Sequence, residues 1–237
     1  SGLIEAIGDW VLNRACQEAA GWPDKSLRVA VNVSAAQFMA GETHKKVARA
    51  LRDSGLDPCR LEIEITESLL ISNTDAVVET LNQIRDMGVS IAMDDFGTGY
   101  SSLSYLSRFP FDKIKIDRSF IHNLGKDAGT DAIVTSIIGL GRSLDVLITA
   151  EGVENQEQVT LLRAAGCNLV QGYLFGRPGS VEAHANFMAR NDPRPAMVHT
   201  KAHASIAQAA EELADTEIEA ADQEQNAQPQ PPVSATG

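Results

Sequence analysis

Two patterns of hydrophobic and polar residues alternate along most of the chain. Short runs rich in β-formers, typical of β-strands, occupy residues 27–33, 61–65, 89–93, 113–116, 146–150 and 168–171. Longer stretches with helical spacing lie at residues 3–19, 35–54, 73–87, 130–142 and 156–165. Three of these predicted helices end before a glycine, a common helix stop, at Gly55, Gly88 and Gly166. This alternation predicts an α/β protein with a parallel sheet.

The polar residues at the carboxyl ends of these strands distinguish two arrangements of such a sheet. The ends carry acids, amides or an ammonium group, at Asn32, Glu64, Asp94, Asp95, Lys115, Asp117, Glu151 and Gln171. In a TIM barrel these ends converge on one mouth, whereas in a doubly wound sheet they lie along an edge. No G-x-G-x-x-G follows the first strand to favour a dinucleotide fold. We therefore predict a modified TIM (β/α) barrel.

Five of these residues form a set of hard oxygen ligands: Asn32, Glu64, Asp94, Asp95 and Glu151. Carboxylates brought to one rim repel one another, and Mg²⁺ or Mn²⁺ relieves that repulsion. Adjacent carboxylates can serve two ions about 3.5 to 4 Å apart, an arrangement suited to phosphoester hydrolysis. The set contains no His or Cys, which argues against zinc. Lys115 on the same rim is placed to position water or to neutralise a phosphate.

Several polar residues near these strand ends also have a structural explanation. Asp117 stands at a strand-to-helix junction, where Asp commonly caps a helix. Glu154 lies near the start of a predicted helix, where anions suit the helix dipole. One of Glu62 and Glu64, which share a strand, would face solvent or a lysine. The glycine-containing segment 96–103 is either an ordinary turn or a loop that covers a ligand. The sequence leaves these alternatives open.

Composition narrows the classes of partner and compartment. With 20 basic and 32 acidic residues among 237, the net charge of −12 excludes bulk nucleic acid as a partner. The three cysteines have neither disulfide nor metal spacing, which indicates a reducing compartment. No apolar run reaches the roughly 18 residues of a membrane span, and no signal peptide is recognisable. We expect a cytoplasmic location, with any membrane anchor in upstream segments of a longer protein.

The composition changes after residue 190. Residues 191–237 contain 8 acidic and 2 basic residues and are dominated by Ala, Gln, Glu and Pro. We predict a folded domain at 1–190 and a disordered acidic tail at 191–237. The chain begins with Ser-Gly-Leu directly in a helical pattern, so we expect it to be part of a longer protein.

Six motifs identify a family that the whole domain resembles. They are Asn32-Val33-Ser34, Glu64-Ile65-Thr66-Glu67-Ser68, the segment 94–103 that begins Asp94-Asp95-Phe96-Gly97, Lys115-Ile116-Asp117-Arg118-Ser119-Phe120, Ala150-Glu151-Gly152-Val153-Glu154 and Gln171-Gly172-Tyr173. In order and spacing they resemble the EAL domains of bacterial cyclic di-GMP phosphodiesterases. The similarity runs from residue 1 to about residue 190.

The resemblance implies an activity and a set of metal ligands. Members hydrolyse cyclic di-GMP to linear pGpG with Mg²⁺ or Mn²⁺, in a modified TIM barrel that often forms homodimers. Carried over by motif, Asn32, Glu64 and Asp94 hold the first of two ions. Asp94 bridges to a second ion, which Asp95 and Glu151 hold.

The resemblance also implies roles for residues around the metals. Lys115 holds the attacking water, and Glu151 is a candidate base. Gln171 contacts the site. Three acids support it: Glu67, which anchors the flexible loop 95–103, Asp117 and Glu154.

One departure from the family pattern affects the expected activity. The Glu-Ala-Leu signature belongs on a first strand ahead of the helix that opens this chain, and Glu5-Ala6-Ile7 lies within that helix instead. We therefore expect a barrel incomplete at its N-terminus and an inactive chain, in a longer phosphodiesterase with an upstream sensor or diguanylate-cyclase-like domain. The alternative is a non-catalytic module that binds cyclic di-GMP or regulates a partner. The retained acids and loop favour the enzyme.

Overall fold

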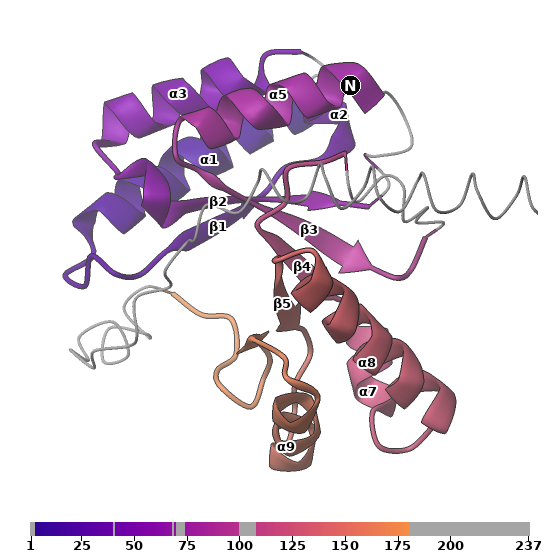
Figure 1. Ribbon diagram of the computed structural model, residues 1–237. Helices are drawn as coiled ribbons and strands as arrows, with labels where there is room; N and C mark the ends of the chain where they lie inside the picture. The colour runs from indigo at the N-terminus through magenta and orange to yellow at the C-terminus, as the bar shows by residue number, and fades with distance from the viewer. Residues whose placement is uncertain (1–2, 40, 68, 70–73, 100–107, 181–237) are drawn as a thin grey trace, which may run out of the picture. The chain divides into compact units, whose positions relative to one another are not determined.

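The computed structural model describes residues 3–39, 41–67, 69, 74–99 and 108–180. Six parallel strands pair in the order in which they occur in the chain (Figure 1). They are β1 (Val29–Asn32), β2 (Leu61–Thr66), β3 (Ser90–Phe96), β4 (Lys113–Ile116), β5 (Leu147–Ala150) and β6 (Leu169–Val170). Sequential pairing of parallel strands is the topology of a TIM barrel, and in the described residues β1 and β6 are the free edges. The predicted fold class, an α/β barrel that is incomplete, is confirmed.

Helices connect the strands along one side of the sheet. They are α1 (Leu3–Gly21), α2 (Ala35–Met39), α3 (Thr43–Ser54), α5 (Thr74–Asp86), α7 (Arg118–Asn123), α8 (Ala128–Ser143) and α9 (Gln156–Ala165), with a short 3₁₀ helix η1 (Pro58–Arg60). Helices α1, α3 and α5 pack beside one another near β1 to β3, while α8 packs on β4 and β5 (Figure 1).

The two faces of the sheet differ in chemistry. On the outer face, Ile63 pairs in register with Ile91, Ile114 pairs with Ile148, and all four are buried. Ile148 faces α8, since a Cβ built on Gly141 would lie 2.4 Å from it. Strand residues alternate between faces, so the positions between these isoleucines turn inward, and many of them are charged. The hydrophobic core therefore lies between sheet and helices, and the inner face carries polar chemistry.

The predicted strands are confirmed to within a few residues, but one predicted helix is wrong. Residues 35–54 form two helices, α2 and α3, because the chain turns at Gly41 with φ of +80°. The Thr43 hydroxyl donates to the carbonyl of Gln37 at 2.9 Å, which fixes the turn. The structure also adds α7, which is absent from the predicted helix ranges, although helix capping was one of the explanations given for Asp117.

Parts of the sequence analysis fall outside the described residues. The predicted tail at 191–237 and the domain boundary at 190 lie there and stay predictions, as does most of the 96–103 loop beyond Gly99. None of the helices in the described segments combines the length and the apolar character that crossing a membrane requires.

Candidate active site

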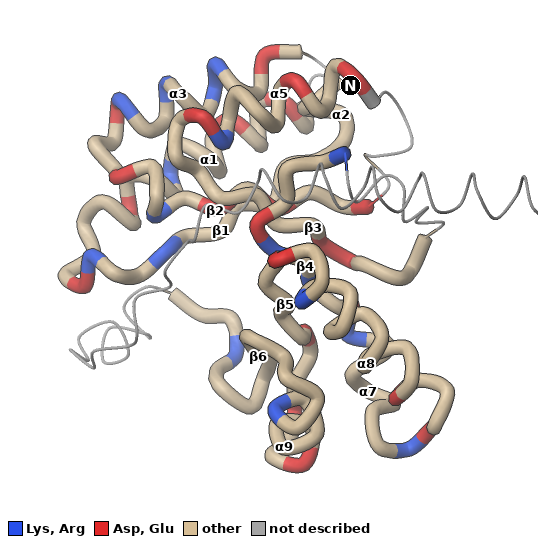
Figure 2. The backbone as a smooth tube through the Cα atoms, viewed as in Figure 1, with Lys and Arg blue, Asp and Glu red and all other residues tan. Residues whose placement is uncertain are grey.

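A buried lysine surrounded by acids lies on the inner face of the sheet. The Nζ atom of Lys115 on β4 is 2.9 Å from Oε2 of Glu64, 3.0 Å from Oδ1 of Asp94 and 2.7 Å from Oε1 of Glu151. The Lys115 side chain is 5% exposed. These residues come from β4, β2, β3 and the end of β5, and acidic and basic segments meet near β3 and β4 in Figure 2. Strands distant in sequence thus supply one cluster.

An irregularity in β3 brings the adjacent acids Asp94 and Asp95 to the same cluster. Consecutive residues of a regular strand point to opposite faces. The pairing of β3 with β4 shifts register between Met93 and Phe96, and Asp95 takes the left-handed conformation with φ of +56°. Carboxylate oxygens of Asp94, Asp95 and Glu151 consequently lie within 4.8 Å of one another.

The electrostatics of the cluster reflect four carboxylates that share one ammonium. Burial raises the pKa of Glu64 and of Glu151, and the hydrogen bonds from Lys115 only partly oppose it. Desolvation and the neighbouring Asp94 carboxylate raise the pKa of Asp95. Burial alone would lower the pKa of Lys115, but its bonds to Glu151 and Glu64 raise it. The ammonium stays charged, and the cluster keeps an excess of negative charge.

This excess of acidic oxygen fits a divalent cation. Oxygens of Asp94, Asp95 and Glu151 already lie within 4.8 Å of one another. Glu64 is outside this group but contacts the same Lys115 ammonium as Asp94 and Glu151. Asn32 pairs in register with Glu64 on the neighbouring strand, and Asn32 is exposed. Hard oxygen donors of this kind suit Mg²⁺ or Mn²⁺.

A pocket of about 550 Å³ opens beside the cluster. Its lining includes Glu151, Glu154 and Gln171, three of the predicted site residues. The remaining side chains of the lining come from α7 and from the segment after β6, namely Arg118, Ser119, His122, Asn123 and Tyr173. None of these five is among the predicted site residues. Arg118, Ser119 and Tyr173 belong to the motifs quoted above, so the sequence could have indicated them as site residues. His122 carried no signal.

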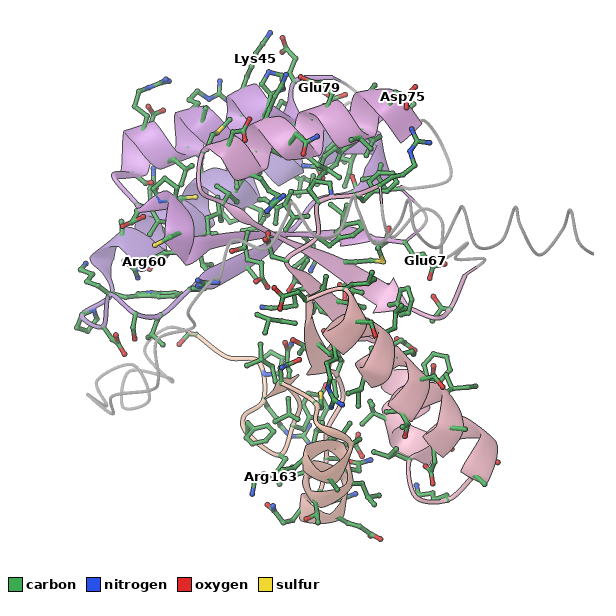
Figure 3. All side chains as sticks on the ribbon, viewed as in Figure 1. Lys45, Arg60, Glu67, Asp75, Glu79 and Arg163 are labelled. Atoms are coloured by element: carbon green, nitrogen blue, oxygen red, sulfur yellow. The ribbon has the colours of Figure 1, made fainter. Side chains whose placement is uncertain are left out.

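Glu67 contacts the start of the loop that follows β3. Its buried carboxylate accepts a hydrogen bond from the backbone N–H of Gly97 at 3.2 Å (Figure 3). A Cβ built on Gly99 would lie 2.7 Å from Oε1 of Glu67, so a larger residue there would displace the Glu67 carboxylate. Oε1 is buried without a hydrogen-bond partner among the described residues.

The structure also shows the surroundings of three other acids, and it answers the alternatives left open for Asp117 and Glu62. Asp117 caps α7, accepting from the N–H of Ser119 at 2.9 Å, which lowers the pKa of Asp117 against the effect of partial burial. Glu154 is exposed and lines the pocket. Glu62 faces a lysine, Lys113, on the same inner face as Glu64.

Comparison with known proteins assigns most of the chain to one family. Residues 1–178 match the family model described as "EAL domain". MucR of Pseudomonas aeruginosa, described as a bifunctional diguanylate cyclase/cyclic di-GMP phosphodiesterase, is 46% identical over 185 residues, which are 77% of this chain and 27% of MucR. The chain spans about a quarter of the length of the curated relatives it matches.

Two of the solved structures that this chain resembles are complexes with cyclic di-GMP. The MucR phosphodiesterase in complex with cyclic di-GMP superimposes with a TM-score of 0.73 at 45% identity, over 77% of this chain and 75% of that one. The manganese/cyclic di-GMP complex of Klebsiella pneumoniae BlrP1 has a TM-score of 0.61 at 32% identity, over 74% of this chain and 44% of that one.

Proposed function

Because the chain belongs to the EAL domain family, we propose that it is a phosphodiesterase domain that hydrolyses cyclic di-GMP to linear pGpG. The observation that carries the proposal is the inner-face cluster of Glu64, Asp94, Asp95 and Glu151 around Lys115, beside a pocket of about 550 Å³. The relative named as a cyclic di-GMP phosphodiesterase and the complex of its domain support the choice of substrate.

The proposed cofactor is a pair of Mg²⁺ or Mn²⁺ ions. Asn32, Glu64 and Asp94 would hold one ion, and Asp94, Asp95 and Glu151 the other. Such ions, when bound, supply positive charge that stabilises the attacking and leaving oxygens and lowers the pKa of water. The manganese complex of BlrP1 supports this proposal, as does the excess of negative charge in the cluster.

The chain's own residues orient the nucleophile and accept its proton. The Lys115 ammonium, whose Nζ lies 2.7 to 3.0 Å from three carboxylates, would hold the attacking water by turning one of its three N–H donors from a carboxylate to the water oxygen. Glu151, whose Oε1 lies 2.7 Å from the Lys115 Nζ that would hold the water, is placed to accept the proton. Water then bonds to phosphorus, and the bond from phosphorus to the leaving sugar oxygen breaks.

The pocket beside the cluster would bind part of the substrate. Arg118 offers a cation to a phosphate, and Gln171 offers an amide to a phosphate or a base edge. Tyr173, which is 55% exposed, offers a flat ring for stacking. We further propose a homodimer, and an upstream sensor or diguanylate-cyclase-like domain of the kind that MucR's description names.

A second function, binding without turnover, is favoured by one observation. Asn32 lies on the edge strand β1 with its side chain exposed, so the proposed ligand set is open to water on that side. On this account the chain itself binds cyclic di-GMP and turns it over slowly or not at all.

One experiment separates the two functions. The chain and the complete gene product that contains it are each incubated with cyclic di-GMP and excess Mn²⁺, and pGpG is followed by chromatography. Affinity for cyclic di-GMP is measured in parallel by calorimetry with Ca²⁺ in place of Mn²⁺. Formation of pGpG by the gene product supports the enzyme. Binding without pGpG in both samples supports the binding module, and neither binding nor pGpG contradicts both.

A further inference from the structure

A second buried ion pair lies on the inner face directly below the Lys115 cluster. The Nζ atom of Lys113 is 2.8 and 2.6 Å from the two carboxylate oxygens of Glu62. The Lys113 and Glu62 side chains are 14% and 5% exposed. Lys113 precedes Lys115 by two residues on β4, and Glu62 precedes Glu64 by two on β2, so the two pairs occupy successive layers of one face.

Stability alone does not account for this pair. The interior layers of a TIM barrel are filled mainly by Val, Ile and Leu. A buried ion pair often stabilises a fold no better than apolar residues of the same volume, because both charges lose their hydration. A layer that holds Lys113 and Glu62 therefore points to an effect on the neighbouring layer, where Lys115 stands.

The charge of Glu62 affects the cluster above it. Glu62 and Glu64 are two residues apart on the same face of β2, so the Glu62 carboxylate lies in the layer next to the Lys115 ammonium. If Lys113 were absent, the Glu62 carboxylate would compete with Glu64 for the Lys115 ammonium. Arg28 reaches the same layer, where its Nη1 donates to the Ser90 hydroxyl at 3.4 Å. Lys113 contacts both carboxylate oxygens of Glu62, so we assign the neutralisation of Glu62 to Lys113.

We propose that Lys113 is a positioning residue of the active site. By neutralising Glu62 it leaves the Lys115 ammonium to Glu64, Asp94 and Glu151. The effect on turnover rests on the proposed function, whereas the effect on the position of Lys115 does not.

The first test reads the position of Lys115 without any reaction. Protein labelled with ¹³C at lysine Cε is compared by NMR as wild type, Lys113→Met and Lys113→Met/Glu62→Gln, all free of metal. The Lys115 signal is assigned from its loss in Lys115→Met. We expect this signal to move in Lys113→Met and to return in the double variant, where no charge is left uncompensated. Lys45→Met, which breaks the exposed Lys45–Glu42 pair of 3.1 Å, is the matched control and leaves the signal in place (Figure 3).

The second test reads turnover and metal affinity. Lys113→Met is expected to lower kcat by about 10- to 100-fold, the usual effect of groups that orient a metal site, while Mn²⁺ affinity by calorimetry is no weaker than in the wild type. The double variant recovers most of kcat, and KM stays within a few-fold throughout. If Lys113→Met does not fold, Lys113→Gln, which keeps a donor without the charge, replaces it.

Two results would overturn the inference. An unmoved Lys115 signal in a folded Lys113 variant shows that Glu62 does not compete for Lys115, for example because Arg28 compensates it. Weaker Mn²⁺ binding with an unmoved signal would mean that Lys113 supports the metal-binding residues and does not position Lys115. If the wild type produces no pGpG, the proposed function fails, and the NMR comparison still decides the position of Lys115.

Discussion

Asp95 is the residue at which local backbone strain and the chemistry of the site meet. A non-glycine residue in the left-handed region costs of order 1–3 kcal/mol, although Asp tolerates it better than most residues. The same conformation brings the Asp95 carboxylate to Asp94 and Glu151, which repel it. Both costs have one explanation, because a bound cation offsets repulsion among converging carboxylates.

Asp94→Asn tests the central position of Asp94, which contacts Lys115 and also belongs to the converging group. The neutral amide keeps the size of the side chain but removes the negative charge that faces Lys115 and that belongs to the converging carboxylates. We expect turnover to fall at least about 100-fold and Mn²⁺ affinity to fall in calorimetry. The matched control is Asp75→Asn on α5, an exposed acid paired with Arg108 at 2.9 Å (Figure 3). Turnover within a few-fold of the wild type would show that the metals lie elsewhere.

The three cysteines are expected to differ in reactivity according to burial. Burial raises the pKa of Cys16 to about 11, and Cys16 is fully buried on α1. Because the thiolate is the reactive form, a disulfide reagent at pH 8 should modify the exposed Cys59 first, Cys167 more slowly and Cys16 only after unfolding. Mass spectrometry of peptides over time checks this order. Early labelling of Cys16 would mean that α1 opens readily.

At the scale of elements, the sequence predicts strands well and turns poorly, for physical reasons. Strands such as 146–150 follow from apolar runs that any buried parallel strand requires. The break at Gly41 was missed because good helix formers flank a glycine that helices tolerate at a modest cost. The β3 irregularity at Asp95 arises from pairing with β4, which is a long-range contact that no local pattern contains.

Glu67→Ala tests the contact between β2 and the loop after β3. Its carboxylate accepts from the Gly97 N–H, and Gly99 approaches the same carboxylate closely. Alanine removes the acceptor, so we expect Gly97 to lose its contact with β2 and turnover to fall about tenfold or more, while the far-UV circular dichroism is unchanged. The control is Glu79→Ala, an exposed acid on α5 (Figure 3). Normal turnover and normal metal dependence in Glu67→Ala would reduce Glu67 to a structural acid.

Across the whole sheet, the convergence of the site follows from topology. Parallel strands in sequential order put all their carboxyl ends on one rim, so the polar residues at those ends could be predicted to meet. The sequence did not predict which side chains share a layer on the inner face of the sheet, or which helix lines the pocket. Whether Glu62 faces Lys113 or solvent, and whether α7 walls a pocket with Arg118, depends on how strands shear and helices pack.

Arg60 joins the start of the sheet to the helical layer. Its side chain is buried, Nε donates to the carbonyl of Leu27 at 2.9 Å, and Nη2 donates to the carbonyl of Ala19 at 2.8 Å (Figure 3). It thereby ties the end of α1 and the segment leading into β1 to the start of β2. These bonds matter most where β1 is a free edge, because an edge strand has a neighbour on one side only.

Arg60→Met is therefore expected to destabilise the protein without touching the site. Methionine fills most of the volume but removes two hydrogen bonds to carbonyls, of which that of Ala19 still accepts from the Trp22 N–H at 3.2 Å. At 1.5–3 kcal/mol for each bond to a charged group, partly relieved by water and by this remaining bond, we expect a loss of about 2–4 kcal/mol. Urea denaturation followed by far-UV circular dichroism measures this loss. Arg163→Met, an exposed arginine on α9, is the control and should change the free energy of unfolding by less than about 0.5 kcal/mol.

Affinity for Mn²⁺ should be unchanged in both variants at a temperature where both are folded. Equal stabilities would show that α1 and β1 are held by apolar packing alone, whereas a loss of Mn²⁺ affinity in Arg60→Met would show that the edge of the sheet and the metal-binding rim are coupled.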